Sequence, residues 1–207
     1  MNNARILRLD PAGPIDQSLI AEAAGALLQG KLILMPTDTV YGVAALAGRP
    51  GTAALLGLLK GRPAGKPIPL LAADRAVVEK TGAVFGRAAR ELARCFWPGP
   101  LTLVLPAADG WEGFRVPGHP VALSILRAAG GLLRATSANL SGQAPALDAE
   151  AALKALGHGV ALVIDAGPAP GGRPSTVVKI EDEKVVVLRE GALSASVIQA
   201  ACRRATT

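Results

Sequence analysis

Short apolar runs alternate with helix-like segments along most of the chain, and this alternation restricts the fold more than any other feature. Strand-like runs lie at 31–35, 68–72, 101–105, 114–116, 132–135 and 160–164, and helix-like segments lie at 16–29, 52–60, 85–96, 120–128 and 148–156. This order predicts an α/β protein with a parallel or mixed sheet flanked by helices. Two further runs, 176–180 and 184–188, surround an acidic turn, and Ser194 then caps a final helix. Such a closing hairpin favours a twisted mixed sheet over a purely parallel one.

No linker-like stretch divides the 207 residues into two cores, and this length is typical of one domain. We therefore expect a single domain over residues 1–207, with the motif-bearing part at about 16–190 and no second C-terminal domain. The most loop-like segment, GPAPGGRP at 167–174, is short enough to be an active-site loop.

Several classes of protein are excluded by the composition. The longest stretch without a charge, residues 95–108, has 14 residues and three prolines, whereas a membrane-spanning helix needs about 20 apolar residues. Charges at Arg5, Arg8 and Asp10 interrupt any secretory signal. Two cysteines 107 positions apart make no disulfide framework, and no Cys/His spacing typical of a metal site is present. We expect a cytoplasmic protein with no membrane contact.

The chain carries a net charge of +6, with 22 Lys and Arg against 16 Asp and Glu, and Arg outnumbers Lys by 15 to 7. Guanidinium groups match phosphate and carboxylate oxygens well. The charge therefore favours anionic partners such as nucleotides, tRNA or acidic metabolites. A GC-rich genome, which favours Arg codons whatever the function, accounts for the same bias equally well.

Four polar clusters follow or precede apolar runs, where ligands collect in α/β sheets. The first, PTDTVYG at 36–42, follows a predicted strand and crowds Thr37, Asp38, Thr39 and the one tyrosine, Tyr41, onto one turn. A helix N-cap by Thr37 or Asp38 is the plainer interpretation.

The second cluster, KGRPAGKP at 60–67, resembles a Walker A loop only superficially, because the glycine spacing is wrong and a proline replaces the Mg²⁺-binding Ser or Thr. Its three cations could clamp a triphosphate or form a solvated basic loop.

The third cluster, ATSANLSG at 135–142, offers a hydroxyl at Ser137 and a carboxamide at Asn139 that would point to one side of an extended segment. An ordinary polar turn is the alternative. The fourth is dispersed over Arg115, Ser175, Thr176 and Arg189, and an isolated arginine at a strand end is more often a surface ion pair. The sequence has no G-x-S-x-G, HExxH, CxxC or G-x-G-x-x-G motif, so it lacks the motifs typical of hydrolases, zinc proteins and dinucleotide-binding proteins.

Taken together, six motifs closely resemble the YrdC-like family of threonylcarbamoyl-adenylate synthases. In chain order they are PTDTVYG, KGRPAGKPIPLL, FWPGPLTLVL, FRVPGHP, TSANLSG and STVV. The resemblance implies a twisted mixed α/β sheet with a concave basic face. It also implies an ATP-dependent nucleotidyltransferase that makes threonylcarbamoyl-AMP from L-threonine, bicarbonate and ATP, releases pyrophosphate and supplies the threonylcarbamoyl modification of tRNA.

The resemblance also implies roles for particular residues. ATP-binding positions match Lys60, Arg62, Lys66, Ser137, Asn139 and Arg189, and L-threonine-binding positions match Thr37, Arg115 and Ser175. Thr39 and Tyr41 could instead be structural. The reaction needs no covalent nucleophile on the protein, because positioning and electrostatics would suffice. Mg²⁺ would accompany the phosphates, and tRNA-modifying proteins, with tRNA itself as a further candidate, would be the macromolecular partners.

Two other functions compete with this one. A YciO-like paralogue could use the same basic face to bind RNA or ribosomes with little synthase activity. RNA-binding surfaces interleave aromatic side chains with cations, and the sequence has only 1 Tyr, 2 Trp and 3 Phe, which favours the enzyme. A carbamoyltransferase domain would lie within a much longer chain.

Overall fold

The computed structural model describes residues 4–63, 67–108 and 110–205. Within these residues ten strands form one mixed sheet in the order β1-β8-β2-β3-β7-β4-β6-β5-β9-β10. The strands are β1 (Arg5–Arg8), β2 (Ile33–Met35), β3 (Gly42–Leu46), β4 (Leu70–Ala72), β5 (Leu101–Ala107), β6 (Gly110–Arg115), β7 (Leu132–Ser137), β8 (Leu162–Asp165), β9 (Thr176–Glu181) and β10 (Lys184–Arg189). The predicted mixed α/β sheet is confirmed, since β8 is parallel to β1 and β2 whereas β9 and β10 form an antiparallel hairpin.

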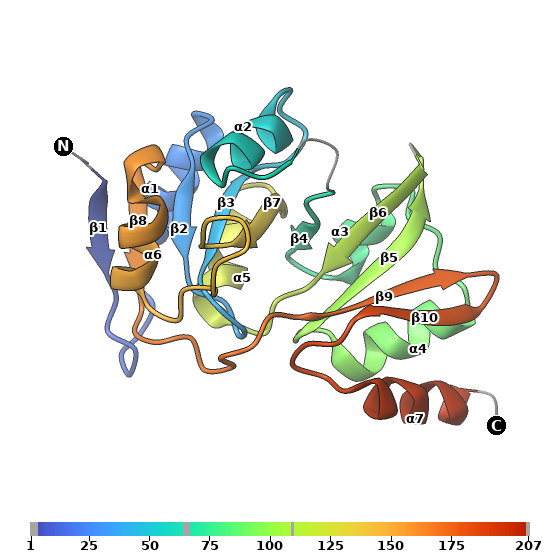
Figure 1. Cartoon of the computed structure of the whole chain (residues 1–207). Helices are drawn as coiled ribbons and strands as arrows, with labels where there is room; N and C mark the ends of the chain where they lie inside the picture. Colours follow the sequence, from blue (N-terminus) through green and yellow to red (C-terminus); the bar gives the residue numbers. More distant parts are fainter. Residues whose placement is uncertain (1–3, 64–66, 109, 206–207) are drawn as a thin grey trace.

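Helices cover the sheet unevenly (Figure 1). They are α1 (Gln17–Leu28), α2 (Thr52–Leu59), α3 (Arg75–Glu79), α4 (Arg87–Phe96), α5 (Pro120–Ala128), α6 (Ala149–Leu156), the 3₁₀ turn η1 (Gly157–Gly159) and α7 (Ala195–Ala205). In the half built on β1, β8, β2, β3 and β7, α1 and α5 pack on one face, and α2 and α6 pack on the other. In the half built on β6, β5, β9 and β10, the core cluster holds side chains of α3, α4 and α7. This second half therefore has one face covered by helices.

Alternation along the strands of the second half separates its two faces. On β5, Leu101, Leu103 and Leu105 are fully buried in the helix-facing core. The residues between them, Thr102 and Val104, line a pocket on the other face. Because successive side chains of a strand point to opposite faces, the same alternation on β6 and β9 brings Trp111, Arg115 and Val177 to that open face.

The sequence predicted most elements correctly and missed three. Helix α5 has the predicted bounds, and Asp16 caps α1 by accepting a 2.8 Å hydrogen bond from the Ser18 amide. Strands β1 and β3 and helix α3 were not predicted, because they are short or dominated by Gly, Ala and charged residues, which give weak periodicity. The interpretation of Thr37 or Asp38 as a helix cap was wrong, since the next element in the chain is strand β3.

The β9–β10 hairpin is tied to the start of α4. The α4 N-cap, Gly86, has no side chain to accept a hydrogen bond. Instead the Glu183 carboxylate, from the tip of the hairpin, accepts from the amides of Arg87 (2.9 Å) and Ala88 (2.7 Å). A carboxylate at a helix N-terminus satisfies unpaired amides and complements the helix dipole. No helix of the described part is long and apolar enough to cross a membrane.

Candidate functional site

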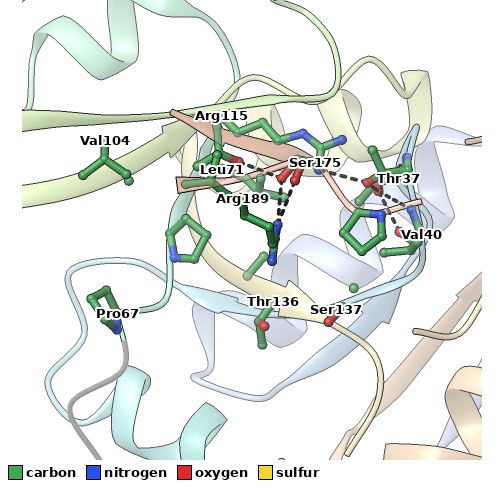
Figure 2. A pocket seen from close by; sticks show the side chains of 18 of the residues that line it. Thr37, Val40, Pro67, Leu71, Val104, Arg115, Thr136, Ser137, Ser175 and Arg189 are labelled. Atoms are coloured by element: carbon green, nitrogen blue, oxygen red, sulfur yellow. Dashed lines mark hydrogen bonds between the residues drawn. The ribbon is translucent and has the colours of Figure 1, made fainter. Parts of the chain in front are cut away.

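A pocket of about 370 Å³ opens on the uncovered face between the two halves of the sheet. Its lining includes seven polar or charged side chains that the sequence analysis had named: Thr37, Thr39, Arg62, Arg115, Ser137, Ser175 and Arg189. Figure 2 shows Thr37, Arg115, Ser175 and Arg189 gathered on one side of this pocket and Val104 and Pro67 on the other. Six elements or loops that are distant in the sequence therefore contribute to one cavity.

Arg115 is the buried cation at the end of β6. Its Nη2 lies 2.6 Å from Asp38 Oδ1, its Nη1 donates to Thr39 Oγ1 (3.0 Å) and its Nε donates to the Gly99 carbonyl (3.0 Å). Burial lowers the pKa of Arg115, and the adjacent Asp38 carboxylate opposes that shift. The guanidinium is thus held in one orientation at the pocket wall, where it could pair with a carboxylate.

Thr37 organises the turn between β2 and β3. Its Oγ1 donates to the Val40 carbonyl (2.6 Å) and accepts from the Thr39 and Val40 amides (3.2 and 3.3 Å). This turn places the Thr39 hydroxyl where it accepts from Arg115. The Thr37 hydroxyl therefore holds the turn, and the Thr39 hydroxyl contacts the arginine. Tyr41 is fully buried and donates to the Gly167 carbonyl (2.6 Å), so its side chain anchors the 167–174 segment. Burial raises the pKa of Tyr41 to about 12.

Ser175 and Arg189 meet at the start of β9. Arg189 Nη2 donates to the Ser175 carbonyl (2.8 Å), and Ser175 Oγ lies 2.8 Å from Thr102 Oγ1. Burial and the charge of Arg62 lower the pKa of Arg189. Thr102 was missed by the sequence analysis, although its place between buried leucines was a signal that it faces away from the core.

Lys60, Ser137 and Asn139 form one cluster beside the pocket. Lys60 Nζ donates to the Ser137 carbonyl and to Asn139 Oδ1 (3.3 Å). Ser137 lines the pocket, whereas Lys60 and Asn139 are buried next to it and are absent from its lining. The Asn139 amide also donates to the Leu140 and Gln143 carbonyls (2.8 and 2.9 Å). Burial and the nearby Arg62 lower the pKa of Lys60 to about 8.

Arg62 connects the cluster to the pocket. Its Nη2 donates to the Pro67 carbonyl (3.0 Å), and its buried Nε has no hydrogen-bond partner. The charge of Arg62 lowers the pKa of both Lys60 and Arg189, and Arg189 acts likewise on Arg115. Four cations are thus close enough to repel one another, which a bound anion would relieve. The third predicted cation of that loop, Lys66, lies outside the described residues.

The other side of the pocket is apolar. Trp111 and Leu188, both exposed, line it together with Val104 and Val177. Trp111 also carries Lys179 Nζ at 3.9 Å from its ring centroid. The sequence analysis missed this apolar wall. Within the described residues no group of three or more His, Cys, Asp or Glu side chains could hold a metal ion.

Comparisons with known proteins agree with this geometry. A family model named Sua5_yciO_yrdC, described as "Telomere recombination", matches residues 25–191. The chain is 40% identical to a protein of Mycobacterium tuberculosis over 196 residues, which cover 89% of this chain and 90% of that relative. It is 35% identical to the threonylcarbamoyl-AMP synthase of Bacillus subtilis, covering 87% of this chain and 56% of that one.

Solved structures of Sua5 and YciO proteins are also similar to this chain. The structure of Pyrococcus abyssi Sua5 complexed with L-threonine is similar with a TM-score of 0.89 and 31% identity, covering 95% of this chain and 60% of that one. The structure of Escherichia coli YciO is similar with a TM-score of 0.84 and 25% identity, covering 94% and 99%. The chain therefore belongs to the Sua5/YciO/YrdC family.

Proposed function

We propose that this protein is a threonylcarbamoyl-AMP synthase, an ATP-dependent nucleotidyltransferase that joins L-threonine, bicarbonate and ATP. One observation carries the proposal: Arg62, Arg115 and Arg189 line a single pocket that Lys60 adjoins. Substrates that bring together a carboxylate, a carbamate and a triphosphate need this excess of positive charge. The names of the relatives, and the L-threonine in the Pyrococcus Sua5 structure, support this choice of substrates.

The pocket divides into two parts in this proposal. Thr37, Arg115 and Ser175 bind L-threonine, with the Arg115 guanidinium on its carboxylate. Arg62, Ser137 and Arg189 bind ATP, and Lys60 and Asn139 support the Ser137 segment from behind while Lys60 adds its charge. Lys66 is a further ATP-binding candidate outside the described residues.

The reaction follows from proximity and charge. The amine of threonine attacks the carbon of CO₂, forms the N–C bond and loses a proton. If bicarbonate itself is attacked, a C–O bond of bicarbonate also breaks, and the released hydroxide takes up that proton and leaves as water. A carbamate oxygen then attacks the α-phosphorus of ATP, and the bond to the β,γ-phosphates breaks, so that pyrophosphate leaves. The cations stabilise the charge on the phosphates during this displacement, and no protein nucleophile is needed.

The described residues offer no carboxylate cluster for Mg²⁺. A magnesium ion that arrives with the nucleotide would be held by phosphate oxygens, as is usual for this ion. We assign no step of the reaction to it.

Threonine-dependent release of pyrophosphate tests the proposal. The purified protein is incubated with ATP, bicarbonate and each of several amino acids, and pyrophosphate is assayed. Release that requires both threonine and bicarbonate is expected, and serine or valine is expected to give far less. Equal release with every amino acid, or none with threonine, would contradict the proposal.

A YciO-like RNA-binding role without catalysis is the less favoured alternative, because the described site is a pocket of about 370 Å³, a size that suits small ligands, rather than a row of exposed aromatic side chains. The product would be consumed in tRNA modification, and we expect the enzyme to work in the cytoplasm with tRNA-modifying proteins.

A further inference from the structure

Two buried hydroxyl groups, those of Thr102 and Ser175, meet in the wall of the pocket. Thr102 lies near the start of β5 and is 3% exposed, and Ser175 directly precedes β9 and is 7% exposed. Their oxygens are 2.8 Å apart, a distance that allows either hydroxyl to be the donor. Both residues line the pocket. The direction of this hydrogen bond therefore decides whether Ser175 offers a ligand a proton or a lone pair.

Backbone contacts hold both residues in place without the hydroxyl groups. Strands β5 and β9 are parallel neighbours in the sheet, and the Thr176 amide donates to the Pro100 carbonyl (3.0 Å) just before β5. The Ser175 carbonyl accepts from Arg189 Nη2 (2.8 Å). Removing either hydroxyl group therefore leaves the pairing of the two strands intact.

The hydrogen-bonding capacity of Ser175 limits the possible arrangements. A hydroxyl group carries one proton and two lone pairs, and a guanidinium can only donate. Arg189 Nη2 lies 3.5 Å from Ser175 Oγ and so faces a lone pair. Among the described residues, Thr102 Oγ1 has no hydrogen-bond partner other than Ser175 Oγ. If Thr102 donates, both lone pairs of Ser175 face donors, and the Ser175 proton is left for the pocket.

The charges around Ser175 favour this direction. Arg62, Arg115 and Arg189 line the same pocket, and Figure 2 shows Arg115, Ser175 and Arg189 on one side of it. A ligand that relieves the repulsion among these cations is an anion, and an anionic oxygen needs donors. A lone pair of Ser175 aimed at such an oxygen would repel it. Ser175 therefore presents its proton to the ligand, and Thr102 donates to Ser175.

The position of Ser175 indicates which oxygen it meets. In the proposed function Arg115 binds the threonine carboxylate and Arg189 binds ATP. Ser175 is bonded to Arg189 and belongs to the threonine part, so it lies where the two parts of the pocket meet. The carbamate must form at this junction, between the nitrogen of threonine and the α-phosphorus of ATP. We propose that Thr102 is a positioning residue whose hydroxyl donates to Ser175, so that the Ser175 proton points at a carbamate oxygen of carboxylated threonine. This inference rests on the proposed function.

A double-mutant cycle on threonine-dependent pyrophosphate release tests the proposal. Ser175→Ala removes the donor to the carbamate and is expected to lower kcat by about 100-fold. Thr102→Val keeps the shape of the side chain but removes the group that orients this donor, and it is expected to lower kcat by about tenfold. The double variant is expected to match Ser175→Ala, because Thr102 acts only through Ser175. Losses that multiply, or a larger loss from Thr102→Val than from Ser175→Ala, would overturn the proposal.

The split between kcat and KM identifies the oxygen that Ser175 contacts. The carbamate does not yet exist when threonine binds, so the KM for L-threonine in Thr102→Val is expected to stay within about twofold of the wild type. A raised KM for L-threonine with an unchanged kcat would assign the Ser175 proton to the threonine carboxylate instead. That result would overturn the assignment to the carbamate.

Conservative variants separate positioning from folding. Thr102→Ser keeps the hydroxyl and is expected to restore most of the activity, whereas Thr102→Ala is expected to behave like Thr102→Val. Equal losses in Thr102→Ser and Thr102→Val would show that the methyl group matters, and would contradict the proposal. The matched control is Thr81→Val, which removes a hydroxyl that donates to the Val78 carbonyl (2.7 Å) outside the pocket lining. It is expected to leave kcat and KM unchanged. Failure of the proposed function is separate, because the wild-type protein itself would then show no threonine-dependent pyrophosphate release.

Discussion

Asp38 and Arg115, 77 residues apart in the sequence, form a buried ion pair at the pocket, with Oδ1 of Asp38 2.6 Å from Nη2 of Arg115. The same oxygen accepts from the Gly118 amide (2.9 Å), so one carboxylate links the β2–β3 turn to the loop after β6. Its second oxygen is buried without a hydrogen-bond partner. The pair thus fixes the guanidinium that we assign to the threonine carboxylate.

Replacing Asp38 with Asn should weaken threonine binding more than it slows turnover. Asparagine keeps an acceptor for the Gly118 amide but removes the charge that orients Arg115, so the KM for L-threonine is expected to rise by about tenfold or more. Steady-state pyrophosphate release at saturating ATP measures this change. An unchanged KM for threonine would show that Arg115 does not need its partner, and the KM for ATP serves as the internal control.

The lowered pKa of Lys60 predicts that activity falls as the pH rises. Burial and Arg62 lower its pKa from 10.5 to about 8, so the free enzyme loses this cation as pH rises through about 8. We expect kcat/KM for ATP to decline there, and Lys60→Arg to move the decline to higher pH because an arginine stays protonated. A decline at the same pH in both proteins would assign it to another group.

The effect of Lys60 on stability has the opposite direction. Between pH 8 and 10.5 Lys60 binds a proton more readily in the unfolded chain than in the folded one. The contribution of Lys60 therefore makes the free energy of unfolding rise with pH in this range.

Arg62→Ala should separate catalysis from folding. The one described hydrogen bond of its side chain goes to the Pro67 carbonyl, so we expect the free energy of unfolding to stay within about 0.5 kcal/mol of the wild type. Loss of a cation aimed at developing phosphate charge should lower kcat/KM for ATP by about 100-fold. The variant should also show its alkaline decline at higher pH, because Arg62 lowers the pKa of Lys60. Arg90→Ala, exposed on α4, is the matched control and should retain full activity.

Glu183→Gln tests the link between the hairpin and α4. Removing the carboxylate that accepts from the Arg87 and Ala88 amides is expected to lower the free energy of unfolding by about 1 kcal/mol, with no change in activity. Urea unfolding measures the loss, and Asp182→Asn at the same hairpin tip is the control. Gly86→Ala should have a similar effect, since a Cβ there would collide with the Glu183 carboxylate. Additive losses in the double variant would argue against a shared contact.

The sequence by itself determined the fold class, most helices and strands, and the motifs that carry the resemblance, because periodicity and capping act within a few residues of the chain. Thr37 and Ser137 could be chosen from their positions after predicted strands, whereas Arg115, inside a predicted strand, was assigned a role only through the resemblance. Only the tertiary structure decided which of these side chains share a cavity. It places Ser137 in the pocket wall and Asn139 behind it, bonded to Lys60, although the two are separated by a single residue.

The apolar wall and the Asp38–Arg115 pair depend in the same way on strand order, which local sequence does not encode. Trp111, Val104 and Val177 become one surface only because β6, β5 and β9 are neighbours in the sheet. Exposure is likewise a tertiary property: α2 has a composition typical of a buried helix, and only the packed structure leaves Leu55 and Leu58 facing outward. Local propensities specify the elements, whereas the packing of distant segments specifies what each side chain meets.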